Sequence, residues 1–177
     1  MLRDRVKLIY ELRCVVTSLN LSERKSAIIA YNDKKGMQAV EAIRLLGQLR
    51  AEGEVYTLVE YLNLQAPVVP SKTATFFDVY PTAGALAQIG VASLDSLLIP
   101  DPTQVIDHHD PALETQLIAA IVQKVLGHKI GIAYAEERLS QMDAGKARTR
   151  LAGIVKYLKT HTARQIEMGN VPIAFTD

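Results

Sequence analysis

The sequence predicts an α/β domain in which a mainly parallel sheet of about four or five strands carries helices on both faces. Short apolar runs alternate with longer stretches of helical periodicity over the first 110 residues. Several of these runs end in an aspartate, which is typical of strands that deliver polar groups to one edge of a parallel sheet. No internal repeat or linker divides the chain, so we expect a single domain over residues 1–177.

The N-terminal segment, residues 2–19, is predicted to be a docked amphipathic helix. Its apolar positions recur at helical spacing: Leu2, Val6, Ile9, Leu12, Val16 and Leu19. Cys14 lies in this apolar stretch and is expected to be a packed thiol. A polar turn over residues 31–36 and a helix from Met37 to near Gly53 follow later in the chain.

Strands are expected at residues 26–30, 55–62, 73–79 and 105–106. The first and last are short apolar runs, the second alternates in polarity, and the third is rich in β-branched and aromatic residues. A mostly helical stretch over residues 82–98 separates the last two strands. This order of strands and helices is the basis of the predicted parallel sheet.

The second half of the chain is predicted to be mainly helical. A helix should begin at Pro111 and stop at Gly127. Residues 129–134 are either a strand or the start of the next helix. That helix is expected through residues 135–142. A longer helix is expected over residues 146–168, and residues 171–175 are a candidate terminal strand.

The composition is that of an ordinary globular protein, with 49% hydrophobic and 22% charged residues. A net charge of +1 provides no whole-chain reason to expect a nucleic-acid or acidic partner. The single cysteine excludes an internal disulfide framework and fits a reducing compartment. Neither a signal peptide nor a run of about 18 apolar residues is evident, so we expect a cytoplasmic protein without membrane association.

The segment most indicative of chemistry is Asp107-His108-His109-Asp110, which follows Val105-Ile106 and precedes Pro111. Adjacent imidazoles flanked by carboxylates offer ligands suited to a divalent transition metal. The structural alternative is a polar loop in which Asp110 caps a helix that Pro111 opens.

Aspartates also follow other predicted strands. Asp33, Asp78 and Asp107 occupy this position, so a parallel sheet would bring them to one edge, and Asp143 could join them from a later turn. Such a cluster could hold Mn²⁺ or Mg²⁺ and promote phosphoester hydrolysis. Each aspartate alone is more simply explained as a helix cap.

Val105-Ile106-Asp107-His108-His109 resembles the signature of DHH-type phosphoesterases, the superfamily of RecJ-type exonucleases and nanoRNases. Residues 31–36, 76–78 and 143–145 correspond to further motifs of that family. The resemblance implies a metal-dependent hydrolase acting on a phosphodiester or phosphoanhydride. It also implies that the metal ligands are Asp33, Asp78, His108 and Asp143. The implied catalytic residues are Asp107, which would orient the cluster, and His109, which would face the phosphate. The implied substrate contacts are Lys34, Lys35 and Arg148.

The first motif departs from the family pattern. Tyr31 stands in place of a His or Asp ligand, and Lys35 replaces an aspartate before Gly36. The two lost ligands and the positive charges of Lys34 and Lys35 favour one metal ion over two, or none. The chain therefore resembles a minimal or degenerate family member. An inactive DHH-like scaffold for a protein or nucleic acid is the main alternative, and an unrelated α/β domain is a third.

The predicted C-terminal helix is basic and has no acidic residue between positions 146 and 164. Its cations are Lys146, Arg148, Arg150, Lys156, Lys159 and Arg164. Such a helix could face phosphates, but a solvated surface balanced by charges elsewhere is the simpler interpretation. We expect His128 and His161 to be surface residues. Candidate partners are a phosphorylated small molecule, a short nucleic acid, another protein or a second copy of the chain.

Overall fold

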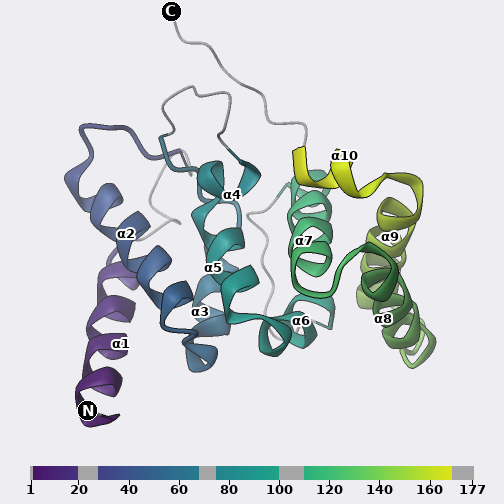
Figure 1. Cartoon of the computed structure of the whole chain (residues 1–177), viewed down its shortest axis with the longest axis horizontal. Helices are drawn as coiled ribbons and strands as arrows, with labels where there is room; N and C mark the ends of the chain where they lie inside the picture. Colours follow the sequence, from purple (N-terminus) through teal and green to yellow (C-terminus); the bar gives the residue numbers. More distant parts are fainter. Residues whose placement is uncertain (1, 20–27, 68–74, 100–109, 169–177) are drawn as a thin grey trace, which may run out of the picture.

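The computed structural model describes residues 2–19, 28–67, 75–99 and 110–168. Within these ranges 78% of the residues are helical and none belongs to a strand of a sheet. The predicted α/β fold with a parallel sheet is therefore wrong for the described part of the chain, which is a helical assembly (Figure 1).

The first half of the chain forms helices of very different length. Their bounds are α1 (Leu2–Thr17), α2 (Lys34–Gln48), the 3-10 helix η2 (Glu52–Glu54), α3 (Val55–Glu60), α4 (Phe76–Val79), α5 (Pro81–Ile89) and α6 (Val91–Leu98). The predicted N-terminal helix is confirmed, and α2 begins earlier than expected because Asp33 caps it. The predicted helix over residues 82–98 is broken at Gly90, whose φ of 89° separates α5 from α6.

The second half contains α7 (Pro111–Leu126), α8 (His128–Ser140), α9 (Lys146–Thr160) and α10 (Ala163–Met168). The predicted start of α7 at Pro111 and its stop at Gly127 are confirmed. Residues 129–134, for which strand and helix were both open, belong to α8. The long helix predicted over residues 146–168 is divided at His161–Thr162 into α9 and α10.

Two predicted strands are helices, and the burial pattern explains why. In residues 55–62 Val55, Leu58, Val59 and Leu62 are buried at the helical spacing i, i+3, i+4, i+7, and Tyr61 is buried beside them. Residues 76–79 form the short helix α4 although their composition favours a strand, because Thr75 and Asp78 form a capping box around its first turn. The predicted strands at 105–106 and 171–175, and residues 73–74 of the strand predicted at 73–79, lie outside the described residues.

Backbone hydrogen bonds connect residues 28–29, residues 65–66 and Val79, which is the last residue of helix α4. Ile28 and Gln65 form an isolated parallel bridge, and the Ile29 amide donates to the Gln65 carbonyl at 2.9 Å. The Ala66 amide donates to the Val79 carbonyl, also at 2.9 Å. Of the strand predicted at 26–30, residues 26 and 27 lie outside the described part. Among the described residues these hydrogen bonds do not extend into the ladder of a sheet.

The core is organised around α5, which packs against α2 on one side and α7 on the other. Helix α1 covers α2, whereas α8, α9 and α10 pack with α7. The docked face of α1 is confirmed at Leu12, Val16 and Leu19, which are buried. The prediction is wrong at Val6, which is 63% exposed, and at Cys14, which is exposed instead of packed.

The contact between α2 and α5 depends on a missing side chain at Gly47. A Cβ atom at this position would lie 2.6 Å from the Ala85 Cα and 2.9 Å from its Cβ. Because the obstacle includes backbone, rotation of a side chain cannot relieve it. Gly47 therefore allows the two helices to approach closely.

None of the described helices is by itself long and apolar enough to cross a membrane. Helices α7 and α8 taken together are long and apolar enough, but the chain bends by 116° between them.

We predict that Gly47→Ala destabilises the protein although alanine is the better helix former. The propensity gain of about 1 kcal/mol should be outweighed by an overpacking cost of about 1–3 kcal/mol, and urea unfolding measures the net loss. Gly53→Ala is the matched control, because a Cβ at Gly53 would meet nothing within 4 Å. Equal stability of the two variants would contradict the close approach at Gly47.

Candidate functional site

Three helices begin at the same end of the molecule. Figure 1 shows α2, α5 and α7 starting at the upper end of the view, with the short helix α4 directly before α5. Helix N-termini present unpaired backbone amides and a partial positive charge, and both favour anions. This end is the candidate functional site, because Asp33, Asp78 and Asp110 all belong to it.

Asp33 is half-buried and caps α2. Its Oδ1 accepts a hydrogen bond from the Gly36 amide at 2.8 Å, and its carbonyl accepts one from the Met37 amide at 2.9 Å. A Cβ at Gly36 would lie 2.6 Å from the Asp33 Oδ2 and 2.7 Å from the Ile29 Cγ2, so this first turn requires glycine. Lys34 and Lys35 are exposed in the same turn. Lysines at a helix N-terminus oppose the helix dipole and add positive potential there.

Asp78 is the N3 residue of the capping box of α4. Its Oδ2 accepts hydrogen bonds from the Thr75 amide at 2.6 Å and from the Thr75 hydroxyl at 2.7 Å. The prediction that Asp78 ends a strand is therefore wrong, and the structural alternative of a helix cap holds for this residue. The pattern Thr-x-x-Asp at residues 75–78 was the signal for that role.

Asp110 caps α7 as the structural alternative predicted. Its Oδ1 accepts from the Ala112 amide at 2.9 Å, and Pro111 occupies the first helical position. Burial raises the pKa of the Tyr80 phenol, and the negative charge of the nearby Asp110 carboxylate raises it further. The α4–α5 junction and the start of α7 are therefore near each other, a proximity that the sequence did not indicate.

The segment Asp107-His108-His109 lies outside the described residues, but it leads directly into Asp110. Whatever path it follows, its last residue is covalently attached to the N-cap of α7. Asp110, the described residue that follows this segment in the sequence, belongs to the upper end.

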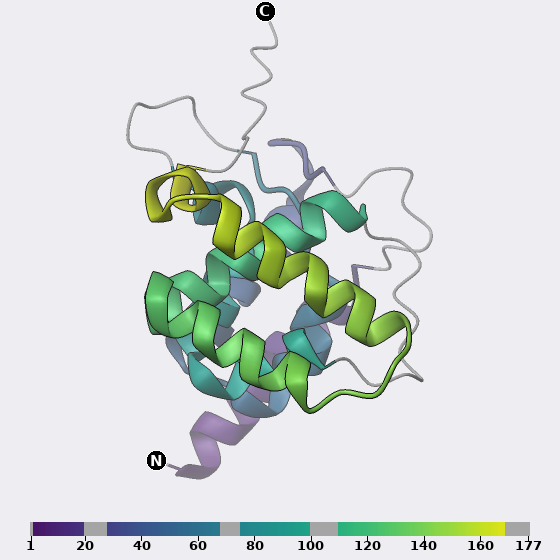
Figure 2. The ribbon, with the colours of Figure 1, turned by 90° about the vertical axis from the view of Figure 1, so that its right-hand side faces the viewer.

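Asp143 and Arg148 lie elsewhere. Asp143 is exposed in the connection between α8 and α9, which lies at the lower end of the molecule (Figure 2). Arg148 is exposed in the first turn of α9 and donates a hydrogen bond to the Met142 carbonyl. Helix α9 packs on α7 and α8, whereas α2 packs on α1 and α5. The described structure does not bring Asp143 or Arg148 to Asp33.

The carboxylates of the described residues do not assemble a metal centre. Across residues 2–19, 28–67, 75–99 and 110–168, no group of three or more His, Cys, Asp or Glu side chains could hold a metal ion. Asp33 and Asp78 each use a carboxylate oxygen to cap a helix. The described part therefore does not fit a two-ion cluster, and a metal site would depend on Asp107 and His108.

Two cations of the basic helix α9 have structural partners. Arg150 forms an ion pair with Glu114 of α7 at 2.6 Å and donates to the Leu97 carbonyl at 2.7 Å. Lys159 pairs with Glu136 of α8. These contacts support the interpretation of α9 as a balanced surface rather than a phosphate-binding helix.

The remaining described histidines are half-buried and serve packing. The Nδ1 atom of His128 lies 3.2 Å from the Gln123 Oε1, and His161 stacks on Tyr157 with ring centroids 3.9 Å apart. The expectation that both are surface residues is thus only partly correct.

Comparisons with known proteins provide no further assignment, because no family description, no curated protein and no solved structure matches the chain.

We predict that Asp110→Asn lowers the pKa of Tyr80. Asparagine is also a good N-cap, so α7 should persist while the negative charge that helps keep the phenol protonated is lost. Ultraviolet titration of the phenolate, with Tyr80→Phe identifying its contribution, measures the shift. A Tyr80 curve unchanged by Asp110→Asn would show that the two segments are not neighbours.

Proposed function

We propose that this chain is a minimal DHH-like phosphoesterase that binds a nucleotide or short oligonucleotide at the upper end of α2, α5 and α7 and hydrolyses a phosphodiester or phosphoanhydride bond. The supporting observation is the shared end at which these three helices begin, together with the direct attachment of Asp107-His108-His109 to α7. Helix N-termini, one of which directly follows an Asp-His-His sequence, suit the recognition and reaction of a phosphoryl group.

The described residues would bind the substrate by charge. Lys34 and Lys35, exposed in the first turn of α2, would neutralise phosphate oxygens, and the amide ends of the helices would add hydrogen-bond donors. His109 immediately precedes the N-cap of α7 and would stabilise the charge that develops on the phosphoryl group. Asp107 would orient the neighbouring imidazole, because a carboxylate partner fixes the tautomer of a histidine.

The proposed cofactor is one Mn²⁺ or Mg²⁺ ion that His108 would hold, with Asp107 orienting this ligand. Its chemistry would be polarisation of a phosphoryl oxygen as a Lewis acid. Asp33 and Asp78 lie at the same end but cap helices, which is why we propose one ion and not two.

A second candidate is a binding module that does not hydrolyse its ligand. The observation that favours it lies in residues 31–36, where Asp33 caps α2 and two lysines follow it. Positive charge beside a cation site disfavours the cation but favours a phosphate. Such a domain would hold a short nucleic acid, or a protein carrying phosphate groups, at the same end.

We predict that His108→Ala abolishes Mn²⁺ binding in isothermal titration calorimetry and the Mn²⁺-dependent hydrolysis of bis(p-nitrophenyl) phosphate. The reason is that the imidazole is the main nitrogen ligand of the proposed site. His128→Ala is the matched control: His128 contacts Gln123 beyond the opposite end of α7, so its loss should leave both signals intact.

The outcomes separate the two candidates. Mn²⁺ binding and turnover that survive in His108→Ala would exclude the proposed site. Absence of both in the wild type, combined with oligonucleotide binding that Lys34→Ala and Lys35→Ala weaken, would establish the binding module instead.

A further inference from the structure

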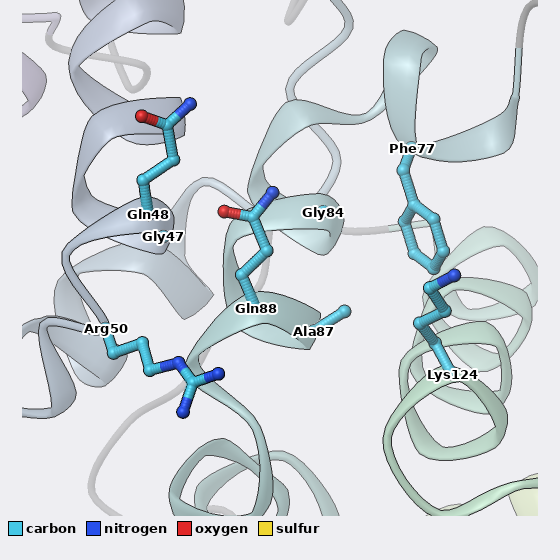
Figure 3. Close-up of a pocket in the computed structure, with 8 residues that line it drawn as sticks. All are labelled: Gly47, Gln48, Arg50, Phe77, Gly84, Ala87, Gln88 and Lys124. Carbon is cyan, nitrogen blue, oxygen red and sulfur yellow. The ribbon is translucent and has the colours of Figure 1, made fainter.

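A groove of about 480 Å³ lies on the side of the molecule, with α5 as its floor (Figure 3). The floor is lined by Gly84, Ala87 and Gln88 of α5. Glycine and alanine leave space above the helix, and the neighbouring helices α2 and α7 rise on either side. Its volume lies within the range of small-molecule sites.

The two walls of the groove each contribute a cation. Arg50, just beyond the C-terminal end of α2, lines one wall, and Lys124 of α7 lines the other. None of the described residues that line the groove is acidic. Within the described chain neither cation has an ion-pair or hydrogen-bond partner for its side chain. A concave surface with charge of one sign concentrates the field and attracts anions.

The backbone at Arg50 is a second, independent reason to assign its side chain a role. Arg50 has a φ of 47°, in the left-handed region that glycine usually occupies at a helix end. The Arg50 amide donates to the Gly47 carbonyl at 2.9 Å and the Ala51 amide to the Leu46 carbonyl at 3.0 Å, which completes a Schellman cap. An arginine is sterically disfavoured here, and such outliers concentrate at functional sites.

The geometry favours a phosphate over a carboxylate. A carboxylate is planar and is satisfied by a single guanidinium, whereas a phosphate monoester has three terminal oxygens, so the exposed side chains of Arg50 and Lys124 can both contact it when they reach inward from the two walls. The remaining lining groups are the amides of Gln48 and Gln88 and the half-buried ring of Phe77 on α4. Amides can hydrogen-bond an organic group, and an aromatic ring can pack against it.

We propose that this groove binds a small organic phosphate, with Arg50 and Lys124 holding the phosphate and Phe77, Gln48 and Gln88 receiving the organic part. The groove shares no residue with the candidate site at the upper end. It is therefore a second binding site, and it stands whether or not the chain hydrolyses phosphoesters.

Calorimetry with adenosine 5′-monophosphate, inorganic phosphate and adenosine tests the proposal. We expect the nucleotide to bind more tightly than inorganic phosphate and adenosine not to bind. Arg50→Gly and Lys124→Gln should each weaken nucleotide binding by about tenfold, as expected for the loss of one charge-assisted contact. Lys156→Gln is the matched control, because Lys156 is an exposed cation of α9 outside the groove.

Arg50→Gly also separates binding from folding. Glycine relieves the left-handed backbone at this position, so the variant should unfold at a midpoint higher by about 2–4 °C while binding less nucleotide. Weaker binding in a more stable protein cannot be attributed to unfolding.

Three results would overturn the proposal. Nucleotide affinity that is unchanged in both Arg50→Gly and Lys124→Gln would show that the groove cations bind nothing. Loss of binding in His108→Ala alone would place the nucleotide at the upper end, and equal affinities for inorganic phosphate and the nucleotide would contradict an organic ligand.

Discussion

The close contact of α2 with α5 is the interaction on which the rest of the structure depends. Gly47 brings its helix so near to Ala85 that a single added carbon would overlap the α5 backbone. Because α5 also packs on α7, this contact determines how all three helices lie. Their N-termini share the upper end, and the space beside α5 becomes a groove between α2 and α7. Both proposed binding sites are consequences of the same packing.

The two sites attract anions by different means. At the upper end the charge comes from backbone amides and from Lys34 and Lys35, and the carboxylates nearby serve as caps. In the groove it comes from Arg50 and Lys124, and none of the described residues that line the groove is acidic. A chain with a net charge of +1 can therefore present two positive surfaces, because its acidic residues are placed elsewhere or used within the fold.

The sequence predicted helices well where capping and periodicity agreed. Asp110, Pro111 and Gly127 mark the ends of α7 as the sequence indicated, and the apolar spacing of α1 is confirmed in its C-terminal half. The sheet was wrongly predicted because short apolar runs fit both a strand and one or two turns of helix. Residues 55–62 alternate in polarity but also have the helical spacing, and residues 73–79 have a β-rich composition but also contain the capping signature at 75–78.

The candidate site was predictable only in part, for physical reasons. Asp33 and Asp78 do lie at one end of the molecule, but they are there because helices begin there and not because strands end there. The proximity of Tyr80 to Asp110 arises from tertiary packing and has no local signal in the sequence. The role of Arg50 at the end of α2 could not be predicted, because the helix was expected to end near Gly53. An arginine instead occupies the left-handed position after the helix.

The most direct test of the upper-end site is paramagnetic broadening of amide signals by substoichiometric Mn²⁺ in the ¹⁵N-labelled protein. Broadening falls steeply with distance from the ion, so it maps the site without assuming its ligands. We predict loss of signal at Lys34, Lys35 and Gly36, at Thr82, and at Asp110 and Ala112, which belong to the starts of three different helices. Broadening centred on Asp143 or in the groove, with these amides unaffected, would contradict the account.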